Sequence, residues 1–550
     1  MDTQPKKNNS FLMQGMILAI AGIITRLIGI AYRIPVTNIL GVEGQGYYGS
    51  AFSIYNIALL LTSYSLPLAV SKLVSARVAK GERKNAFRIF KGALIFAAIA
   101  GAIACLIVLL FSDGIAGSIM GLKLSAYALR VLAPGLFIVA IMGVVRGYFQ
   151  GMGTMVPTAI SQVLEQIVNA IVSIIGASYL LKMGLEISKK SGDTSIAYAY
   201  GAAGGTLGTV SGAFIGLVFL LILFRLYYPR LQKQIGREDV YKPESYRNIY
   251  RVLLLTIAPV ILSTAIYNIS ETIDMGLFSK LMSAQGHSED QVAALLGRFT
   301  GHYNVMINIP LAIANALGAA LIPSLTATIS SGTKREAHLK MGSVIRFSML
   351  IAIPCCIGFL ALANPILSML FSGDIGISAS MLRLGAITIV FYCLSTVTNA
   401  ILQGINRMTT PVKHGAISLV IHLVCVVIML AVFKWGIYAL VVGNIIFSLS
   451  MCLLNARALR VAISYRQEWK RTFIVPFIAA SVMGIVAFLI YLLFDLFLPL
   501  WLALILAVLI AVIVYAIGLL KLGALSQDEI LDMPKGATVL QLLQKLHLIA

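Results

Sequence analysis

Long apolar stretches dominate this chain and restrict what it can fold into. A helix needs about 20 mostly apolar residues to cross the hydrocarbon core of a membrane. Hydrophobic residues make up 59% of the chain and charged residues 11%, with a mean hydropathy of +0.93, whereas soluble domains carry about a quarter charged residues. The sequence predicts an all-α polytopic membrane protein with fourteen spans near residues 11–34, 46–70, 90–111, 124–149, 156–181, 199–226, 250–279, 298–325, 342–363, 378–403, 411–433, 436–457, 472–494 and 499–520.

The basic residues alternate between the connections of these spans. The 42 Lys and Arg residues exceed the 21 Asp and Glu residues and give a formal net charge of +21, which by itself suits nucleic acid or an anionic surface. Most of them, however, fall in every second connection, including 72–91, 225–251 and 457–471. The other connections hold Lys123, Lys182, Lys189, Lys190, Lys280 and Lys434. By the positive-inside rule, this pattern predicts a multi-pass membrane protein with both termini in the cytoplasm, and it makes nucleic acid an unnecessary partner.

The chain also contains an internal repeat. "LLFSDG" at 109–114 returns as "MLFSGD" at 369–374, and "FQGMGTMVP" at 149–157 is echoed by "LQGINRMTTP" at 402–411. Tyr48 and Pro67 find counterparts in Tyr303 and Pro323. An even number of spans separates the copies, so they are parallel six-helix repeats. We therefore expect an N-lobe at 1–226, a cytoplasmic linker at 227–249, a C-lobe at 250–460, two extra helices at 461–521 and a cytoplasmic tail at 522–550.

Motifs for catalysis and cofactor binding are missing from the sequence. The six cysteines lie in apolar runs, and neither they nor the six histidines show metal-ligand spacing. "GQGYYG" at 44–49 satisfies the G-x-G-x-x-G pattern, but we expect it in a short loop between two spans with no preceding strand. Glycines 204, 208, 212 and 216 suit close helix packing. We expect no enzyme activity, no metal and no cofactor.

Polar residues inside the spans are the candidates for function, because ionisable groups at membrane depth usually face a bundle interior or a hydrated cavity. Arg26 and Arg33 stand seven residues apart, so they share one helix face, with Gly29 between them. The span at 156–181 carries a polar stripe, and further polar groups occur on later spans. From these we predict a central cavity whose substrate-binding residues are Arg26, Arg33, Arg298, Gln162, Glu165, Asn169 and Asn304.

Two alternatives stay open for these charges. The arginines can pair with Glu271 or Asp274, and Arg33, near the end of its helix, can reach the membrane interface by snorkelling. Glu271 and Asp274 can equally form a cation site, which would couple transport to Na⁺ or H⁺. The membrane potential is the alternative source of coupling.

The arginine-bearing stretch "TRLIGIAYR" at 25–33 is similar to the "SRxLGFxR" signature of MurJ-type lipid II flippases. "LIPSLTATISSG" at 321–332 resembles the "LLPSLS…SG" end of their eighth helix, and residues 46–75 are typical of the branch of stage V sporulation protein B. The chain thus resembles the multidrug/oligosaccharidyl-lipid/polysaccharide exporter superfamily over nearly its whole length. Aligned on Pro323, the eighth-helix arginine of the MurJ branch falls near Asn304, and Arg298 lies about two turns earlier.

The resemblance implies a flippase for a lipid-linked cell-wall precursor, most simply lipid II, which alternating access carries to the outer leaflet. It also implies the membrane lipid and the cell-wall synthesis machinery as partners. Arginine suits this cargo because its planar fork matches phosphate and carboxylate. The rivals are an exporter of another undecaprenyl-linked saccharide, a cation-coupled multidrug antiporter, whose cationic cargo the arginines would repel, and a scaffold without transport.

Overall fold

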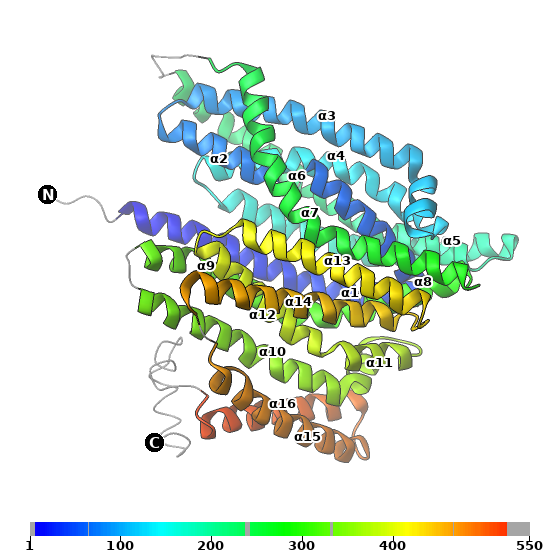
Figure 1. Cartoon of the computed structure of the whole chain (residues 1–550). Helices are drawn as coiled ribbons and strands as arrows, with labels where there is room; N and C mark the ends of the chain where they lie inside the picture. Colours follow the sequence, from blue (N-terminus) through cyan, green and yellow to red (C-terminus); the bar gives the residue numbers. More distant parts are fainter. Residues whose placement is uncertain (1–5, 64, 237–242, 331–333, 466, 525–550) are drawn as a thin grey trace. The chain divides into compact units, whose positions relative to one another are not determined.

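The computed structural model describes residues 6–63, 65–236, 243–330, 334–465 and 467–524 (Figure 1). Within these ranges the chain is helical and contains no β-strand. It divides into two compact units, Met1–Gly301 and His302–Ala550. The predicted lobe and linker boundaries follow the repeat instead, and they stay a prediction.

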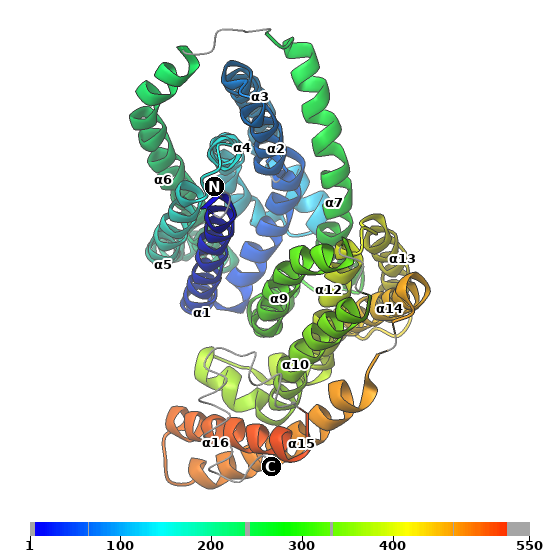
Figure 2. The same ribbon diagram turned by 90° about the vertical axis from the view of Figure 1, so that its left-hand side faces the viewer.

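The first unit contains the helices of the first half of the chain and the beginning of the second. They are α1 (Lys6–Thr62), α2 (Leu66–Ala79), α3 (Arg83–Ile115), the π-helix η1 (Ala116–Met120), the 3-10 helix η2 (Lys123–Ser125), α4 (Ala126–Gly151), α5 (Val156–Ser191), α6 (Ser195–Gly236), α7 (Tyr246–Ala284) and α8 (Glu289–Gly297). The π-helix η3 (Arg298–Tyr303) follows α8. Figure 2 shows α7 beside α2 and α3.

The second unit contains the remaining helices. They are α9 (Asn304–Ser330), α10 (Lys334–Leu370), α11 (Gly376–Gly385), α12 (Ile387–Gly404), α13 (Thr409–Ala431), α14 (Tyr438–Ile463), the π-helix η4 (Lys470–Ile474), α15 (Val475–Asp495) and α16 (Leu500–Lys521). α15 and α16 pair with each other, and both contact α10 (Figure 1).

The predicted spans coincide for most of their length with helices among the described residues, and together with the shared fold of a solved relative this confirms the fourteen-helix polytopic fold with two repeats and two added helices. Among the described residues, eleven helical segments are long and apolar enough to cross a membrane, and the first of them, Ile20–Ala79, contains two predicted spans. These eleven segments thus include every predicted span except those on α7 and α9, which are helices of 39 and 27 residues.

The turn between the first two spans is a kink within α1. Gly41 has φ 65° and ψ 179°, a left-handed value that glycine adopts without steric cost. The "GQGYYG" residues Gly44–Gly49 are helical, which corrects the expected loop. The absence of a strand before them agrees with the rejection of a nucleotide site.

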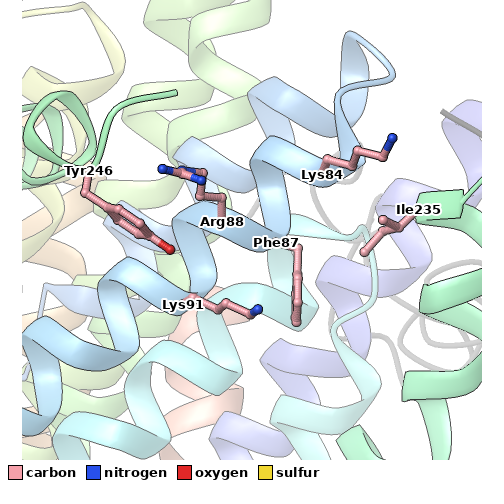
Figure 3. Close-up of a pocket in the computed structure, with 6 residues that line it drawn as sticks. All are labelled: Lys84, Phe87, Arg88, Lys91, Ile235 and Tyr246. Atoms are coloured by element: carbon pink, nitrogen blue, oxygen red, sulfur yellow. The ribbon is translucent and has the colours of Figure 1, made fainter. Parts of the chain in front are cut away.

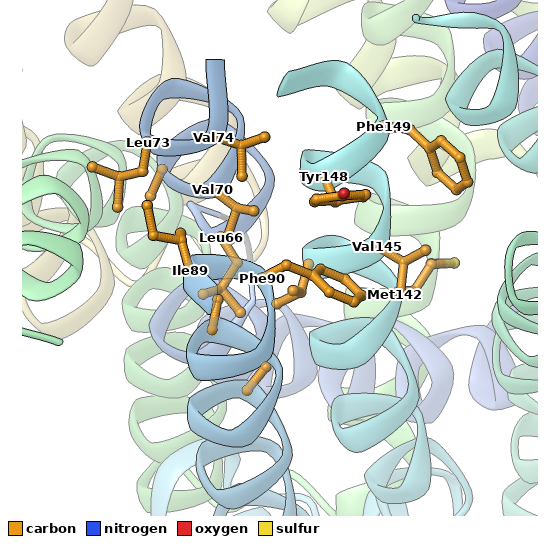
Figure 4. Close-up of a cluster of buried hydrophobic side chains, with 14 of the residues drawn as sticks. Leu66, Val70, Leu73, Val74, Ile89, Phe90, Met142, Val145, Tyr148 and Phe149 are labelled. Atoms are coloured by element: carbon orange, nitrogen blue, oxygen red, sulfur yellow. The ribbon is translucent and has the colours of Figure 1, made fainter. Parts of the chain in front are cut away.

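A hydrophobic cluster packs α2, α3, α4 and α6 together in the first unit, with aliphatic side chains from α2 and aromatic rings from the other three helices (Figure 4). The rings of Phe90 and Tyr148 lie 4.6 Å apart between centroids, and Phe90 also meets Phe224 at 5.1 Å. Burying rings of this size makes a large contribution to stability. Glycines bring α4 close to α2, because a Cβ on Gly147 would lie only 2.7 Å from the carbonyl oxygen of Pro67.

In the second unit, the connection from α14 to η4 folds back on α10. A ring nitrogen of His338 hydrogen-bonds the carbonyl oxygen of Ile463 at 2.9 Å, and Arg346 pairs with Glu468 at 2.5 Å. Burial and the nearby Glu468 carboxylate raise the pKa of Tyr465 to about 12, so its hydroxyl stays protonated at neutral pH. These contacts attach the last two helices to the preceding repeat.

Candidate functional site

The predicted site residues divide between the two units. Asn304 begins α9 in the second unit and is half-buried. The other predicted residues belong to the first unit, on α1, α5, α7 and η3. The contacts described below are those within the first unit, and the predicted cavity between the repeats stays a prediction.

Arg33 lies in an environment of hydroxyl groups and one carboxylate. Its side chain keeps accessible surface on α1 although protein surrounds it, and the groups that act electrostatically on its guanidinium are Tyr32, Tyr48 and Glu271. Tyr32 and Tyr48 come from α1, and Glu271 comes from α7, where it is also exposed. The alternative that the arginines face Glu271 thus describes Arg33 well. This places a cation, a carboxylate and two phenols in one group.

α7 is held against α1 close to this group. The hydroxyl oxygens of Ser53 and Thr272 lie 2.5 Å apart, and both side chains are buried. Asp274 is two residues further along α7 and only 4% exposed. Asp274 is therefore buried whereas Glu271 is exposed, although the sequence analysis considers the two together as one possible cation site. Among the described residues, no cluster of three His, Cys, Asp or Glu side chains suits a metal ion.

Arg26 lies two turns before Arg33 on α1 and is exposed. Gly29, between the two arginines, approaches α5 closely: a Cβ there would lie 3.2 Å from the side-chain nitrogen of Gln166. Gly29 therefore provides close helix contact beside the arginines.

The polar stripe on α5 splits into an ion pair and a hydrogen-bond network. Glu165 pairs with Arg146 of α4 at 2.7 Å, and Arg146 also donates to the hydroxyl of Ser161 at 3.0 Å. Asn169 is buried and donates to the hydroxyl of Tyr32 at 3.2 Å. Since Tyr32 adjoins Arg33, Asn169 fixes the local position of the candidate site.

Gln162 is half-buried on α5, one turn before Gln166. Arg298 is half-buried at the first position of the π-helix η3. A π-helix inside a longer helical run frequently marks a functional segment, which keeps Arg298 among the candidates.

Sequence reasoning gave Arg146 no functional role, yet the residue lies inside the predicted span 124–149 and pairs with the candidate Glu165. That location was the available signal, because an arginine within an apolar span needs a partner. The partner, Glu165, was recognised only as a separate candidate.

The apolar spans and the charged groups that lie within them are those of a polytopic membrane transporter. The chain belongs to the polysaccharide biosynthesis protein family, whose model matches residues 11–329. The MatE family model matches residues 259–428.

Curated relatives extend along most of the chain. The lipid II flippase MurJ of Bacillus subtilis (strain 168) is 28% identical over 497 residues, which cover 87% of this chain and 88% of the relative. Stage V sporulation protein B of the same organism is 24% identical, over 87% of this chain and 90% of its own length.

Solved structures share the fold. The lipid II flippase MurJ in an inward closed conformation superposes with a TM-score of 0.64 at 14% identity, over 92% of this chain and 98% of that structure. A multidrug resistance MATE family transporter of the MOP superfamily, in an inward-facing conformation, superposes with a TM-score of 0.63 at 19% identity. The superposition covers 80% of this chain and 94% of that structure. These structures show that the chain has the fold of the MurJ and MATE transporters.

Proposed function

We propose that this protein is a flippase that moves a lipid-linked cell-wall precursor, most simply lipid II, from the inner to the outer leaflet by alternating access. The observation that carries the proposal is Arg33 with Tyr32, Tyr48 and Glu271 around it. The substrate class comes from the relatives named as lipid II flippase. Transport of this kind makes and breaks no bond in the cargo, so the protein would not be an enzyme.

The head group would bind by exchange of partners. A diphosphate offers the oxygen acceptors that guanidinium binds best, so it would replace Glu271 beside Arg33. The phenols would donate to the remaining oxygens. Release on the outer side would return Arg33 to Glu271. The carboxylate thereby keeps the arginine neutralised when no cargo is bound.

Close backbone contact between α1 and α8 supports a gate at one end of the cavity. A Cβ on Gly46 would lie 1.9 Å from the carbonyl oxygen of Ala293, and one on Gly297 would lie 1.7 Å from that of Val42. With both termini in the cytoplasm, this contact falls on the outer side. We infer that it is the outer gate, closed here, and that opening it releases the head group.

The negative charge of the cargo would couple its transport to the membrane potential. An inside-negative potential favours outward movement of an anion by about 2.3 kcal/mol per charge per 100 mV. Cation coupling through Glu271 or Asp274 is the second proposal. Flipping rates that stay the same when Na⁺, pH and potential are varied in proteoliposomes would remove both forms of coupling.

The test is complementation in cells depleted of their lipid II flippase. We expect the wild-type protein to restore lipid II at the outer surface, and Arg33→Ala and Arg26→Ala to reduce it. Glu271→Gln tests the exchange of partners, since it removes the resident anion while keeping a hydrogen-bonding group of similar size.

Three outcomes separate the rivals. A wild-type protein that reaches the membrane but restores no lipid II would move the assignment to another undecaprenyl-linked saccharide. Resistance to cationic drugs would favour the antiporter. Normal flipping by Arg33→Glu would contradict the role of the arginine, and would leave the scaffold as the simpler explanation.

A further inference from the structure

A basic pocket lies where α3, the end of α6 and the start of α7 meet within the first unit (Figure 3). It encloses about 470 Å³, including its open mouth. Its lining residues are Lys84, Phe87, Arg88, Lys91, Ile235 and Tyr246. Three of the six are cations, and none of these described lining residues is a carboxylate. The arginine cluster of α1 contributes none of these residues.

The three cations share one face of α3. Lys84, Arg88 and Lys91 follow one another at intervals of four and three residues, which places them side by side on a helix. Like charges at these spacings destabilise a helix. An anion bound between them would turn this repulsion into attraction.

Aromatic rings hold two of these cations in place. The guanidinium carbon of Arg88 lies 4.2 Å from the ring centroid of Tyr246, and the Lys91 ammonium lies 4.7 Å from that of Phe87. Stacking on a ring face leaves the in-plane N–H donors of arginine available. The Nε of Arg88 is shielded from solvent and has no hydrogen-bond partner among the described residues. A buried donor of this kind is costly unless an acceptor reaches it.

The wall that carries Tyr246 is anchored to the first repeat. Arg77 donates two hydrogen bonds to the Glu244 carboxylate, at 2.8 Å and 3.0 Å, and the Glu244 backbone N–H donates to Asn85 at 3.1 Å. α3 and α7 also approach closely, since a Cβ on Gly92 would lie 3.4 Å from the Tyr246 ring. The pocket therefore has fixed walls, and the nearby Glu244 is engaged by Arg77.

We propose that this pocket binds the phosphate group of an anionic ligand, either an anionic membrane lipid headgroup or a soluble phosphate. Phosphate oxygens match the donors of Arg88 and the charge of Lys91. The pocket also lies on the basic side of the chain, where anionic lipids of the cytoplasmic leaflet would be concentrated. The ligand would join α3 to the first helix of the second repeat. The site is independent of the proposed flippase activity.

The test counts bound lipid on the purified full-length protein by native mass spectrometry, with phosphatidylglycerol added to detergent micelles. We expect Arg88→Gln/Lys91→Gln to weaken the tightest phosphatidylglycerol adduct about tenfold, since each cation contributes about a factor of three to five. Arg225→Gln/Arg230→Gln is the matched control. It removes two exposed cations of α6 from the same side of the chain, and should change binding less than twofold.

A second arm separates the two sources of phosphate. Millimolar inorganic phosphate should displace phosphatidylglycerol and raise the unfolding temperature if the ligand is soluble, and should do neither if it is a lipid. Should the double variant unfold, Tyr246→Leu compared with Tyr246→Phe tests the same pocket through the ring that holds Arg88. Equal binding by wild type and both pocket variants, or an equal loss in the α6 control, would overturn the proposal.

Discussion

At the residue scale, the arginines of the first unit meet two kinds of partner. Arg146 is paired with Glu165 by a 2.7 Å contact and supported by Ser161, so its charge is already satisfied. Arg33 is exposed, with phenols and the Glu271 carboxylate acting on it. A fixed pair suits a structural role. An accessible guanidinium with an exchangeable counter-ion suits binding.

Breaking the Arg146–Glu165 pair should destabilise the protein without requiring any loss of cargo affinity. We expect Arg146→Ala or Glu165→Ala to lower the apparent free energy of unfolding by about 1–3 kcal/mol, because each leaves a partly buried charge unpaired. Replacing both, as Arg146→Met/Glu165→Leu, should cost less than either single change. Thermal unfolding in detergent measures all three. A double variant as unstable as the sum of the single variants would show that the pair contributes nothing as a pair.

Glu289 at the start of α8 should make stability depend on pH. Its carboxylate accepts a hydrogen bond from the backbone N–H of Leu124 at 2.9 Å, while burial raises the pKa of the group. The folded state therefore holds this proton more tightly than the unfolded state. The contribution of Glu289 to stability is greatest below its ordinary pKa and decreases as pH rises through the raised value.

Glu289→Gln tests this sign, because glutamine keeps an acceptor for the Leu124 N–H and carries no charge. We expect the variant to match wild type in acid and to be more stable above the raised pKa. Glu289→Ala, which loses the acceptor, should be less stable than Glu289→Gln throughout. Unfolding temperatures measured from pH 4 to 8 distinguish these cases. A gap between wild type and Glu289→Gln that widens toward acid would contradict the assignment.

At the scale of elements, glycines set how closely helices approach. The α6 glycines that suggested close packing do pack on α5: a Cβ on Gly208 would lie 2.1 Å from the Ser173 hydroxyl oxygen, and one on Gly212 would lie 2.4 Å from the Glu165 carbonyl oxygen. Glycines also allow α1 and α8 to pack closely, because Gly46 lies against the backbone of Ala293 and Gly297 lies against the backbone of Val42. The first contact is internal to one repeat. The second joins helices from different repeats.

Adding one methyl group at Gly297 should push α8 away from α1. A Cβ there would lie 1.7 Å from the carbonyl oxygen of Val42, and backbone cannot yield as a side chain can. We expect Gly297→Ala to lower stability by about 1–3 kcal/mol and to shift the protein toward an open outer gate. Unfolding temperature and outside labelling of a cysteine introduced at Val42 measure the two effects.

Gly22→Ala is the control for this change, since a Cβ on Gly22 would have no atom within 4 Å. It should leave both readings at the wild-type level. If Gly297→Ala behaved as Gly22→Ala does, the contact between α1 and α8 would be looser than described and could not act as a gate.

At the scale of the whole molecule, charge distribution determines how the chain sits in the membrane. Basic residues on alternate connections predict which ends of the helices face the cytoplasm. A cysteine introduced at Ser191, after α5, should react from outside intact cells with a membrane-impermeant maleimide. A cysteine at Ser245, before α7, should react only after the cells are opened. The reverse pattern would invert the topology and assign the contact between α1 and α8 to the inner side.

The sequence by itself determined the fold class. Apolar length and the internal repeat were enough for this, because the membrane requires each span to satisfy its backbone hydrogen bonds within a helix. The membrane also makes Arg26 and Arg33 notable, because a charged side chain inside a membrane span is energetically costly unless it has a partner or a function. Local pattern also anticipated the α6 glycines, whose spacing alone places them on one helix face.

Tertiary structure decided which charges meet. Arg146 and Glu165 are 19 positions apart on different helices, and Tyr48, which acts on Arg33, lies beyond the kink of α1 at Gly41. The basic pocket required three helices to converge, and its defining contact, Arg88 on Tyr246, joins residues of α3 and α7. The spacing of residues along one helix cannot predict contacts between residues on different helices. Those contacts depend on how the helices pack, which is determined by the whole fold.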